Sequence, residues 1–453
     1  MADNQDREKR ENCCVAEKIR VPLLEEEKRS SKEERCMVYF STFVAVCGSY
    51  AFGSCAGYSS PTQTAIREDV NLSLAEYSLF GSILTFGAMI GAVTSGKIAD
   101  YIGRKGAMIV SSVFCTAGWL SIYFAQETRE GPLPLDIGRL ATGYGMGVFS
   151  YVVPIFIAEI APKDLRGTLT TINQGFSISI VPCAVLLIGL CIIPESPRWL
   201  AKQGKQKEFE SSLHRLRGKN ADISVEAAEI QDYIETLERL PKAKVLDLFQ
   251  RRYLRSVTIG VGLMVCQQFG GINGICFYTS SIFESSGFPA DVGTIIYAIL
   301  QVIITGLGAT LIDRAGRKPL LVVNNQVSGA GLVLGCLLTG SSFFLKERGL
   351  AHDAVPALAV IGILVYIGAF SIGMGAIFPI NIKGVAGSLA TLVNWFGAWA
   401  CSYTFNFLMS WSSYGTFVLY ASVNALAILF VIKVVPETKG RTLEQIQTAV
   451  NAS

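Results

Sequence analysis

The sequence predicts an all-α membrane protein of two related six-helix halves, the first of which is short by about one helix. Three observations support this prediction. The chain of 453 residues is 51% hydrophobic and only 17% charged, whereas about 25% of the residues of a soluble chain are charged. Eleven apolar stretches are long enough to cross a bilayer as helices. Two short motifs occur once in each half of the chain.

A helix needs about 20 apolar residues to cross the hydrocarbon core of a bilayer. Five such stretches precede a polar block and six follow it. The candidate spans are 37–58, 76–98, 106–125, 137–158, 168–193, 256–283, 292–312, 319–344, 355–378, 384–409 and 413–435. The expected regions are a disordered cytosolic tail at 1–36, a first transmembrane half at 37–193, an intracellular helical linker at 194–255, a second transmembrane half at 256–435 and a cytosolic tail at 436–453.

Lysine and arginine in the short loops predict the orientation of the spans, because cytoplasmic loops carry an excess of these residues. The loops around Arg104 and Arg317, like the polar block, belong to the cytoplasm by this rule. Both chain termini are then cytosolic. The rule fails once, because a single crossing between Arg166 and Pro194 would place the basic block outside. The stretch 168–193 is therefore expected to cross twice or not at all.

An internal repeat points to the same irregularity independently. Asp-x-x-Gly-Arg-Lys at 100–105 returns as Asp-x-x-Gly-Arg-Lys at 313–318, and Pro-Glu-Ser at 194–196 returns as Pro-Glu-Thr at 436–438. The distance between the two motifs is 94 residues in the first half and 123 in the second, a difference of 29. This difference corresponds to about one helix with its connection. Parallel repeats of six spans are typical of one large class of secondary transporters.

No pattern in the sequence is typical of an enzyme or a metal site. We find no Ser-His-Asp set, no metal-ligand spacing and no nucleotide-binding loop, and the chain has only two histidines. Most of the twelve cysteines stand singly in apolar runs, which indicates small buried side chains. The net charge of +3 gives no support for a nucleic-acid partner. We expect a monomer in a lipid bilayer, without a cofactor or a metal.

Several motifs follow one another in an order that resembles a known family. They are Gly-Arg-x3-Gly-x-Gly-x-Gly at 138–147, Pro-Ile-Phe-Ile-Ala-Glu-Ile-Ala-Pro at 154–162, Pro-Glu-Ser-Pro-Arg-Trp-Leu at 194–200, Gln-Gln-x3-Ile-Asn at 267–273 and Pro-Glu-Thr-Lys-Gly at 436–440. Over residues 40 to 447 the chain resembles the sugar porters of the major facilitator superfamily. The run Asn-Trp-Phe-Gly-Ala-Trp at 394–399 is most similar to their plant dehydration-induced branch. The resemblance implies an alternating-access carrier of monosaccharides in the tonoplast or the plasma membrane.

Recognition of a sugar needs amide groups that both donate and accept hydrogen bonds, and aromatic faces that cover C–H surfaces. Spans 256–283 and 384–409 carry such groups, and the resemblance adds Gln174 and Gln301. The alternative for an isolated membrane glutamine is an interhelical hydrogen bond, which contributes about 1 kcal/mol or less. The predicted sugar-binding residues are Gln174, Gln267, Gln268, Asn273, Gln301, Asn394 and Trp395.

Charged residues at the cytoplasmic span ends have a different predicted role. By resemblance they form inter-helix ion pairs that stabilise the outward-facing state and break in every transport cycle, so modest pair strengths suit them. The alternative is simple positive-inside anchoring. The predicted gating and ion-pair residues are Asp100, Arg104, Arg139, Glu159, Arg166, Glu195, Arg198, Asp313, Arg317 and Glu437.

Arg139 is the one basic residue well inside a candidate span, and an intramembrane charge is costly enough to indicate a function. In proton-coupled relatives such an arginine works with a carboxylate in the first span. Span 37–58 contains no Asp or Glu, and Cys55 stands near the position expected for the carboxylate. Without a titrating group there, the sequence favours facilitated diffusion, and proton-coupled symport is the alternative.

Two departures from the family pattern fall within the spans. After Asn173 and Gln174 the chain passes almost directly from what resembles the fifth helix to what resembles the sixth. In the tenth helix, Met-Gly-Ala at 374–376 continues as Ile-Phe-Pro at 377–379, without the family's Pro-Trp element and glutamate. A transport-defective splice form or a sugar sensor of the same fold is therefore a further alternative.

Overall fold

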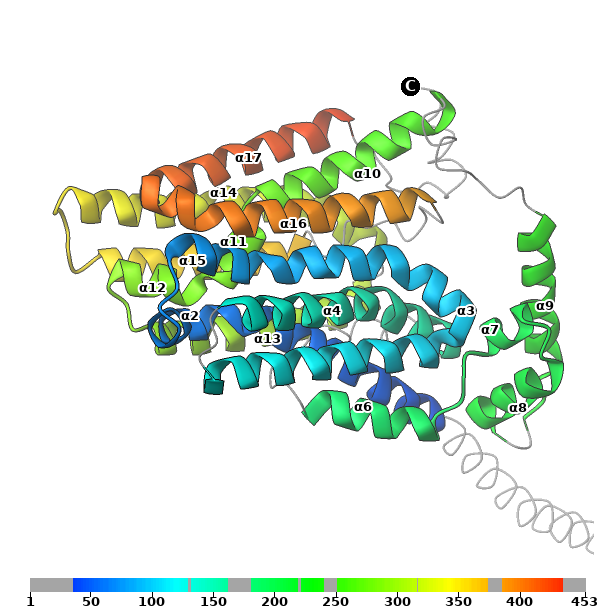
Figure 1. Cartoon of the computed structure of the whole chain (residues 1–453). Helices are drawn as coiled ribbons and strands as arrows, with labels where there is room; N and C mark the ends of the chain where they lie inside the picture. The colour runs from blue at the N-terminus through cyan, green and yellow to red at the C-terminus, as the bar shows by residue number, and fades with distance from the viewer. Residues whose placement is uncertain are drawn as a thin grey trace, which may run out of the picture.

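The computed structural model describes residues 36–128, 132–161, 181–218, 221–239, 251–315, 317–373 and 385–434, and the regular structure of these residues is helical. Six of these helices are long and apolar enough to cross a membrane, and three shorter apolar helices accompany them. The long helices run side by side in one bundle, and α7, α8 and α9 form a separate group beyond one end (Figure 1). We call this the linker end of the bundle, and the opposite end, with α2 and α12, the distal end.

The first half consists of the helix Cys36–Gly57, α2 (Ser59–Asp69), α3 (Leu74–Thr128), α4 (Pro132–Ile160) and α6 (Val181–Ile192). The chain reverses within α3 (Figure 1), at Gly103, whose φ of +86° is not helical. Glycine adopts this conformation without strain, and a Cβ at this position would meet Glu195 Oε2 at 2.6 Å. The two arms of α3 correspond to the spans predicted at 76–98 and 106–125.

Close packing of α3 against α4 explains the glycine-rich motif at 138–147. A Cβ at Gly143 would lie 2.1 Å from the carbonyl oxygen of Leu84, and one at Gly147 would lie 2.1 Å from that of Ala88. Helices without a hydrophobic driving force between them associate through such stripes of small residues. A larger side chain at either position would force the backbones of α3 and α4 apart.

The linker group comprises α7 (Pro197–Lys202), α8 (Gln206–Arg217) and α9 (Ser224–Arg239). Ser196 caps α7, because its Oγ accepts a hydrogen bond from the Trp199 amide at 3.3 Å, and Pro197 follows it. The three helices share a small core of their own, which contains Trp199, Leu200, Phe209, Leu213 and Ile230. The described part of the predicted linker 194–255 is therefore helical, with its own apolar cluster.

Helices α4 and α6 both end at the linker end, where α8 holds their last carbonyl groups. Arg217 Nη1 donates to the carbonyl oxygen of Ile160 at 3.1 Å, and Arg215 Nη2 donates to that of Ile192 at 2.6 Å. Cations at helix C-termini are favourable. The chain between these two carbonyls thus begins and ends at the same end of the bundle. Residues 162–180 lie outside the described part of the chain, so the expectation that 168–193 crosses twice or not at all stays a prediction.

The second half consists of α10 (Arg251–Phe269), α11 (Ile272–Phe277), α12 (Thr279–Ser286), α13 (Ala290–Ala315), α14 (Arg317–Glu347), α15 (Val355–Gly373), α16 (Val385–Trp411) and α17 (Ser413–Val434). The predicted span 256–283 is divided among α10, α11 and α12. The other five helices correspond one to one to the five spans predicted after it. The prediction of an all-α membrane protein is confirmed.

Candidate functional site

The polar site in the second half is built on a break between α10 and α11. Gly271 adopts φ +100° there, and a Cβ on it would lie 2.4 Å from the Tyr420 ring. The carbonyl oxygen of Gly270 accepts hydrogen bonds from Asn424 Nδ2 of α17 and from the Tyr366 hydroxyl of α15, each at 3.0 Å. Irregular backbone at membrane depth is stable only where buried groups satisfy it in this way. The break is therefore fixed by partners from two other helices.

Three of the predicted sugar-binding amides meet at this break. Gln268 Nε2 donates to Asn394 Oδ1 at 2.6 Å, and Asn273 Nδ2 donates to Gln268 Oε1. Gln268 is buried, whereas Asn273 and Asn394 are half-buried. Gly397, one turn after Asn394, permits the contact, because a Cβ there would lie 2.7 Å from Gln268 Cβ. We call Gln268, Asn273 and Asn394 the amide cluster; it joins α10, α11 and α16.

Trp395 lies next in sequence to the amide cluster and connects the two halves of the bundle. Its buried ring stands edge-on to Phe52 of the helix Cys36–Gly57, with the ring centroids 6.3 Å apart. Phe86 of α3 and Trp399 of α16 make a second contact between the halves, at 6.4 Å. Aromatic rings beside amide groups suit a sugar, whose C–H faces they cover. Phe52 and Phe86 belong to no motif, so the sequence did not single them out.

The other predicted binding residues are placed less centrally. Gln267 is half-buried on α10, and Gln301 is exposed on α13. Gln301 follows Tyr297 by one turn, and the Tyr297 hydroxyl donates to Cys276 Sγ in α11 at 3.5 Å. That face of α13 is therefore turned towards the broken helix. Gln174 lies outside the described residues.

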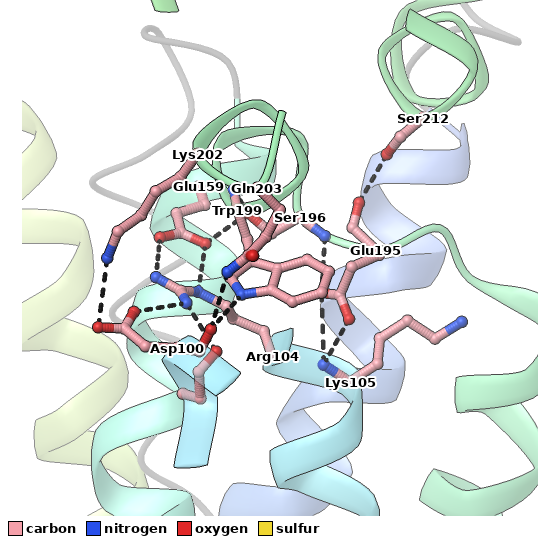
Figure 2. Close-up of polar contacts among 11 residues, drawn as sticks. Asp100, Arg104, Lys105, Glu159, Glu195, Ser196, Trp199, Lys202, Gln203 and Ser212 are labelled. Atoms are coloured by element: carbon pink, nitrogen blue, oxygen red, sulfur yellow. Dashed lines mark hydrogen bonds and ion pairs between the residues drawn. The ribbon is translucent and has the colours of Figure 1, made fainter. Parts of the chain in front are cut away.

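The predicted ion-pair site at the linker end centres on Arg104 of α3 and Glu159 of α4 (Figure 2). Nε and Nη2 of Arg104 each donate to one carboxylate oxygen of Glu159 at 3.0 Å. The exposed fractions of the two side chains are only 12% and 13%. Arg104 Nη1 also donates to the Ala99 carbonyl at 2.9 Å and pairs with Asp100 at 3.2 Å. A two-point pair of this kind fixes both distance and orientation between two helices.

The start of the linker is bound to the same corner of α3 (Figure 2). Trp199 Nε1 and Gln203 Nε2 both donate to the backbone carbonyl of Asp100, at 2.9 and 3.0 Å. Lys202 Nζ pairs with the Asp100 carboxylate at 3.2 Å, in a more exposed position. Ser196 Oγ donates to Glu159. We call these contacts, together with the Arg104–Glu159 pair, the latch; it ties α3, α4 and α7 together.

Glu195 closes the other side of the latch. Its carboxylate accepts hydrogen bonds from the backbone amides of Lys105 at 3.0 Å and Ser196 at 2.8 Å. Its own carbonyl accepts from Ser212 Oγ of α8 at 2.6 Å. Burial raises the pKa of Glu195 above its ordinary value, because desolvation of the carboxylate outweighs the backbone hydrogen bonds that favour the charged form.

The remaining predicted gating residues are only partly described. The Arg198 guanidinium lies 5.5 Å from the centre of the Tyr233 ring, a cation–π contact within the linker. Asp313 lies near the end of α13 and Arg317 begins α14, but the structure does not describe their side chains. Arg166 and Glu437 lie outside the described residues.

Arg139 is fully buried in α4, and the groups around it are neutral. Its Nη1 donates to the Cys55 carbonyl at 2.9 Å, and its Nη2 donates to Ser59 Oγ. The guanidinium lies 5.6 Å from the centre of the Tyr58 ring and 5.0 Å from that of Phe80. Among the described residues no carboxylate forms an ion pair with Arg139. In this chain a backbone carbonyl of the first helix thus binds Arg139. A proton-coupled porter is expected to have a carboxylate near that position.

Known proteins similar to this chain point to one family. The family described as Sugar (and other) transporter matches residues 37–178 and 175–450. Sugar transporter ERD6-like 7 of Arabidopsis thaliana is 67% identical over 467 aligned positions, which cover 96% of this chain and 99% of that protein. Sugar transporter ERD6-like 16 of the same plant is 58% identical over 456 positions, which cover 94% and 93%.

Solved structures agree with these sequence matches. The proton:xylose symporter XylE of the major facilitator superfamily, bound to 6-bromo-6-deoxy-D-glucose, has a TM-score of 0.72 and 25% identity, over 91% of this chain and 99% of that one. The inward-open conformation of the xylose transporter XylE from E. coli has a TM-score of 0.71 and 24% identity over the same shares.

Two features of the sequence matches concern the short first half. The family match is divided at residues 175–178, directly after Gln174. The alignment with ERD6-like 7 has 467 positions, and this chain has only 453 residues. The alignment covers 96% of this chain, about 435 residues, so about 30 of its 467 positions have a residue in the relative and none here. Both features support the prediction that this chain lacks segments that its relatives contain.

Proposed function

The chain belongs to the Sugar (and other) transporter family, and we propose that it carries a monosaccharide across a membrane by alternating access. The observation that carries the proposal is the amide cluster at the broken helix, next to which Trp395 of α16 contacts Phe52 of the other half. Sugar hydroxyls, which donate and accept, can replace the hydrogen bonds that these amides make with one another. The rings of Trp395 and Phe52 would cover the C–H faces of the sugar.

The latch supports a rigid-body mechanism for the first half. It joins α3, α4 and the linker through the Arg104–Glu159 pair and the contacts of the Asp100 carbonyl. These elements then move together when the two halves rock. The linker end faces the cytosol in this proposal, because Lys105, Arg215 and Arg217 gather there. Both termini are then cytosolic, in the tonoplast or the plasma membrane.

Facilitated diffusion is the proposed mode of transport, because Arg139 is bound by neutral groups. Symport would need a group that titrates near it. Asp136, three residues before Arg139 on α4, is the nearest carboxyl group in the sequence, and Glu76 is its acidic neighbour. D-glucose uptake into proteoliposomes that carry a pH dye inside separates the two modes. Uptake without internal acidification supports facilitated diffusion, whereas acidification that Asp136→Asn abolishes would establish symport.

The second candidate function is a transport-defective form or a sugar sensor of the same fold. The divided family match and the positions without a residue in this chain favour it. The test compares D-glucose uptake by this chain with uptake by a version whose gaps are filled from ERD6-like 7, at matched protein insertion. Uptake by both this chain and the filled version supports the proposal that this chain is a carrier. Uptake by the filled version alone, with sugar binding retained by this chain, would support the sensor.

A further inference from the structure

A second polar site lies at the distal end of the bundle, away from the amide cluster and the latch. A cavity of about 220 Å³, partly open to the surface, is enclosed there by α2, the start of α3, α12, α16 and the start of α17. This volume holds several water molecules or one ligand of monosaccharide size. Its polar lining includes Gln63, Arg67, Ser281, Ser285, Asn406 and Ser410. We call it the distal cavity.

The distal cavity lies on the seam between the two halves, because its lining residues come from both. Two hydrogen-bonded contacts cross the seam in its vicinity. The hydroxyl groups of Ser60 and Ser280 lie 2.9 Å apart, and Asn406 Nδ2 donates to Ser78 Oγ at 3.0 Å. Asn406 belongs both to the cavity wall and to the second contact. A ligand in the cavity would therefore touch both bodies that move during alternating access.

Two polar atoms of the cavity wall have no hydrogen-bond partner in the part of the chain that the structure describes. Gln63 is only 7% exposed, and its Oε1 is buried without a donor. Arg67 Nε, one turn further along α2, is likewise buried without an acceptor. A buried polar atom left without a partner costs about 1–3 kcal/mol. One hydroxyl group can satisfy both atoms, since it donates to Gln63 and accepts from Arg67.

The charges around the cavity favour a neutral ligand over an anion. Among the described residues that line the cavity, Arg67 is the one that carries a charge. Glu68 and Asp69 follow it directly and are exposed, and Glu284 lies between two lining serines on α12. These carboxylates offset the fields of Arg67 and of Lys346, whose Nζ donates to the carbonyl oxygen of Ser285. The other polar lining groups are amides and hydroxyls, which match the hydroxyl groups of a polyol.

We propose that the distal cavity is a second binding site for a neutral, monosaccharide-sized polyhydroxy compound, in which Gln63 Oε1 accepts from a ligand hydroxyl and Arg67 Nε donates to it. If the site receives a sugar at the entrance of the transport pathway, that role rests on the proposed function. The capacity of the site to bind a polyol is independent of the proposed function. The site lies where the seam between the halves reaches the surface.

The test is protection of the cavity from alkylation in the full chain, reconstituted in lipid nanodiscs. Ser285→Cys places a thiol in the wall, and mass spectrometry of the peptide with residue 285 follows its reaction with a membrane-impermeant maleimide. D-glucose, D-xylose and myo-inositol are the neutral probes, and D-gluconate is the anionic probe. A ligand at about ten times its dissociation constant occupies about nine-tenths of the sites, so alkylation slows about tenfold.

Variants separate this site from the amide cluster. We expect protection by at least one neutral probe to be lost with Gln63→Leu and retained with Thr64→Val, a matched change on the exposed side of α2. Protection should also persist with Gln268→Leu in the amide cluster. If Gln63→Leu does not fold, Gln63→Glu serves, because its carboxylate pairs with Arg67 and removes both unpartnered atoms.

Three outcomes would overturn the proposal: no protection by any neutral probe, stronger protection by D-gluconate, or protection that Gln268→Leu abolishes. The last would show that the thiol reports a conformational change driven from the amide cluster. D-glucose uptake by the same purified protein, reconstituted in proteoliposomes, tests the proposed function separately. Uptake without protection refutes the distal site alone, and protection without uptake refutes the carrier alone.

Discussion

Removal of the Arg104 charge should destabilise the linker end more than removal of Arg104 and Glu159 together. In Arg104→Gln the Glu159 carboxylate, only 13% exposed, loses both 3.0 Å contacts and keeps Ser196 as a donor. Loss of one partner of a buried pair costs about 3–5 kcal/mol, and we expect about 2–4 kcal/mol here because both groups retain some contact with water. In the double variant with Glu159→Gln, two neutral amides can bond to each other.

The measurement is the free energy of unfolding in mixed micelles for both single variants and the double variant. The cycle should give a coupling energy of about 1.5–3 kcal/mol between the two positions. Lys205→Gln is the matched control. Lys205 pairs with Glu208 in the same region, but the two side chains are 49% and 60% exposed. Its removal also ends a cation–π contact with the Trp199 ring at 5.9 Å, and it should change the free energy of unfolding by about 1 kcal/mol or less.

Two results would refute this reasoning. An effect of Arg104→Gln as small as that of Lys205→Gln would show that the pair contributes no more than an exposed one. Strictly additive single variants would show that Arg104 and Glu159 act through separate partners, such as Asp100 and Ser196. Either result would leave the latch as a set of independent anchors and remove the argument that α3 and α4 move as one body.

The further predictions concern substitutions at five single positions. Gln268→Leu and Trp395→Ala should each lower the initial rate of D-glucose uptake at least about tenfold at matched insertion, because a site built on amides loses its polar partners. Gly397→Val should cost about 1–3 kcal/mol in the free energy of unfolding, because its Cβ would lie 2.7 Å from Gln268 Cβ. The raised pKa of Glu195 means that the folded chain binds this proton more tightly than the unfolded chain. Its contribution to stability is therefore full below the ordinary carboxyl pKa and is lost as the pH rises through the folded value, and Glu195→Gln should flatten that part of the stability–pH profile. Cys55→Asp places a carboxylate beside Arg139 and should make D-glucose uptake acidify the proteoliposome interior, which the parent chain should not do.

The spans could be predicted from the sequence because each depends only on the hydropathy of its own consecutive residues. A run of apolar residues long enough to cross a bilayer needs no partner to be recognised. The division of span 256–283 into three helices was not predicted. Hydropathy averages over a window of about 19 residues, and the break at Gly270 and Gly271 is short and lies inside an apolar run. The glycine pair was visible, but its φ depends on the packing of Tyr420.

The amide cluster was predicted by residue type, whereas its support was not. Gln268 and Asn273 lie five residues apart, so their nearness could be expected, but their hydrogen bond is made across the break between α10 and α11. Asn424 and Tyr366 are single polar residues in long apolar spans, a pattern that equally fits interhelical hydrogen bonds. Their importance follows from the free carbonyl of Gly270, which exists only because the helix is broken. No local pattern contains that information.

The short first half affects the transport route more than the orientation of the chain. α6 has 12 residues, about 18 Å of helix, against a hydrocarbon core of about 30 Å. Its last carbonyls are nevertheless held at the linker end by Arg215 and Lys105. The linker therefore lies at the same end of the bundle as the ends of α4 and α6, although the sequence between the flanking motifs is 29 residues short. The latch is made by residues up to Glu159 and from Ser196 onward, so none of its contacts uses the short stretch. Transport depends on it if a full fifth helix is needed to enclose the sugar, so uptake and insertion have to be measured on the same preparation.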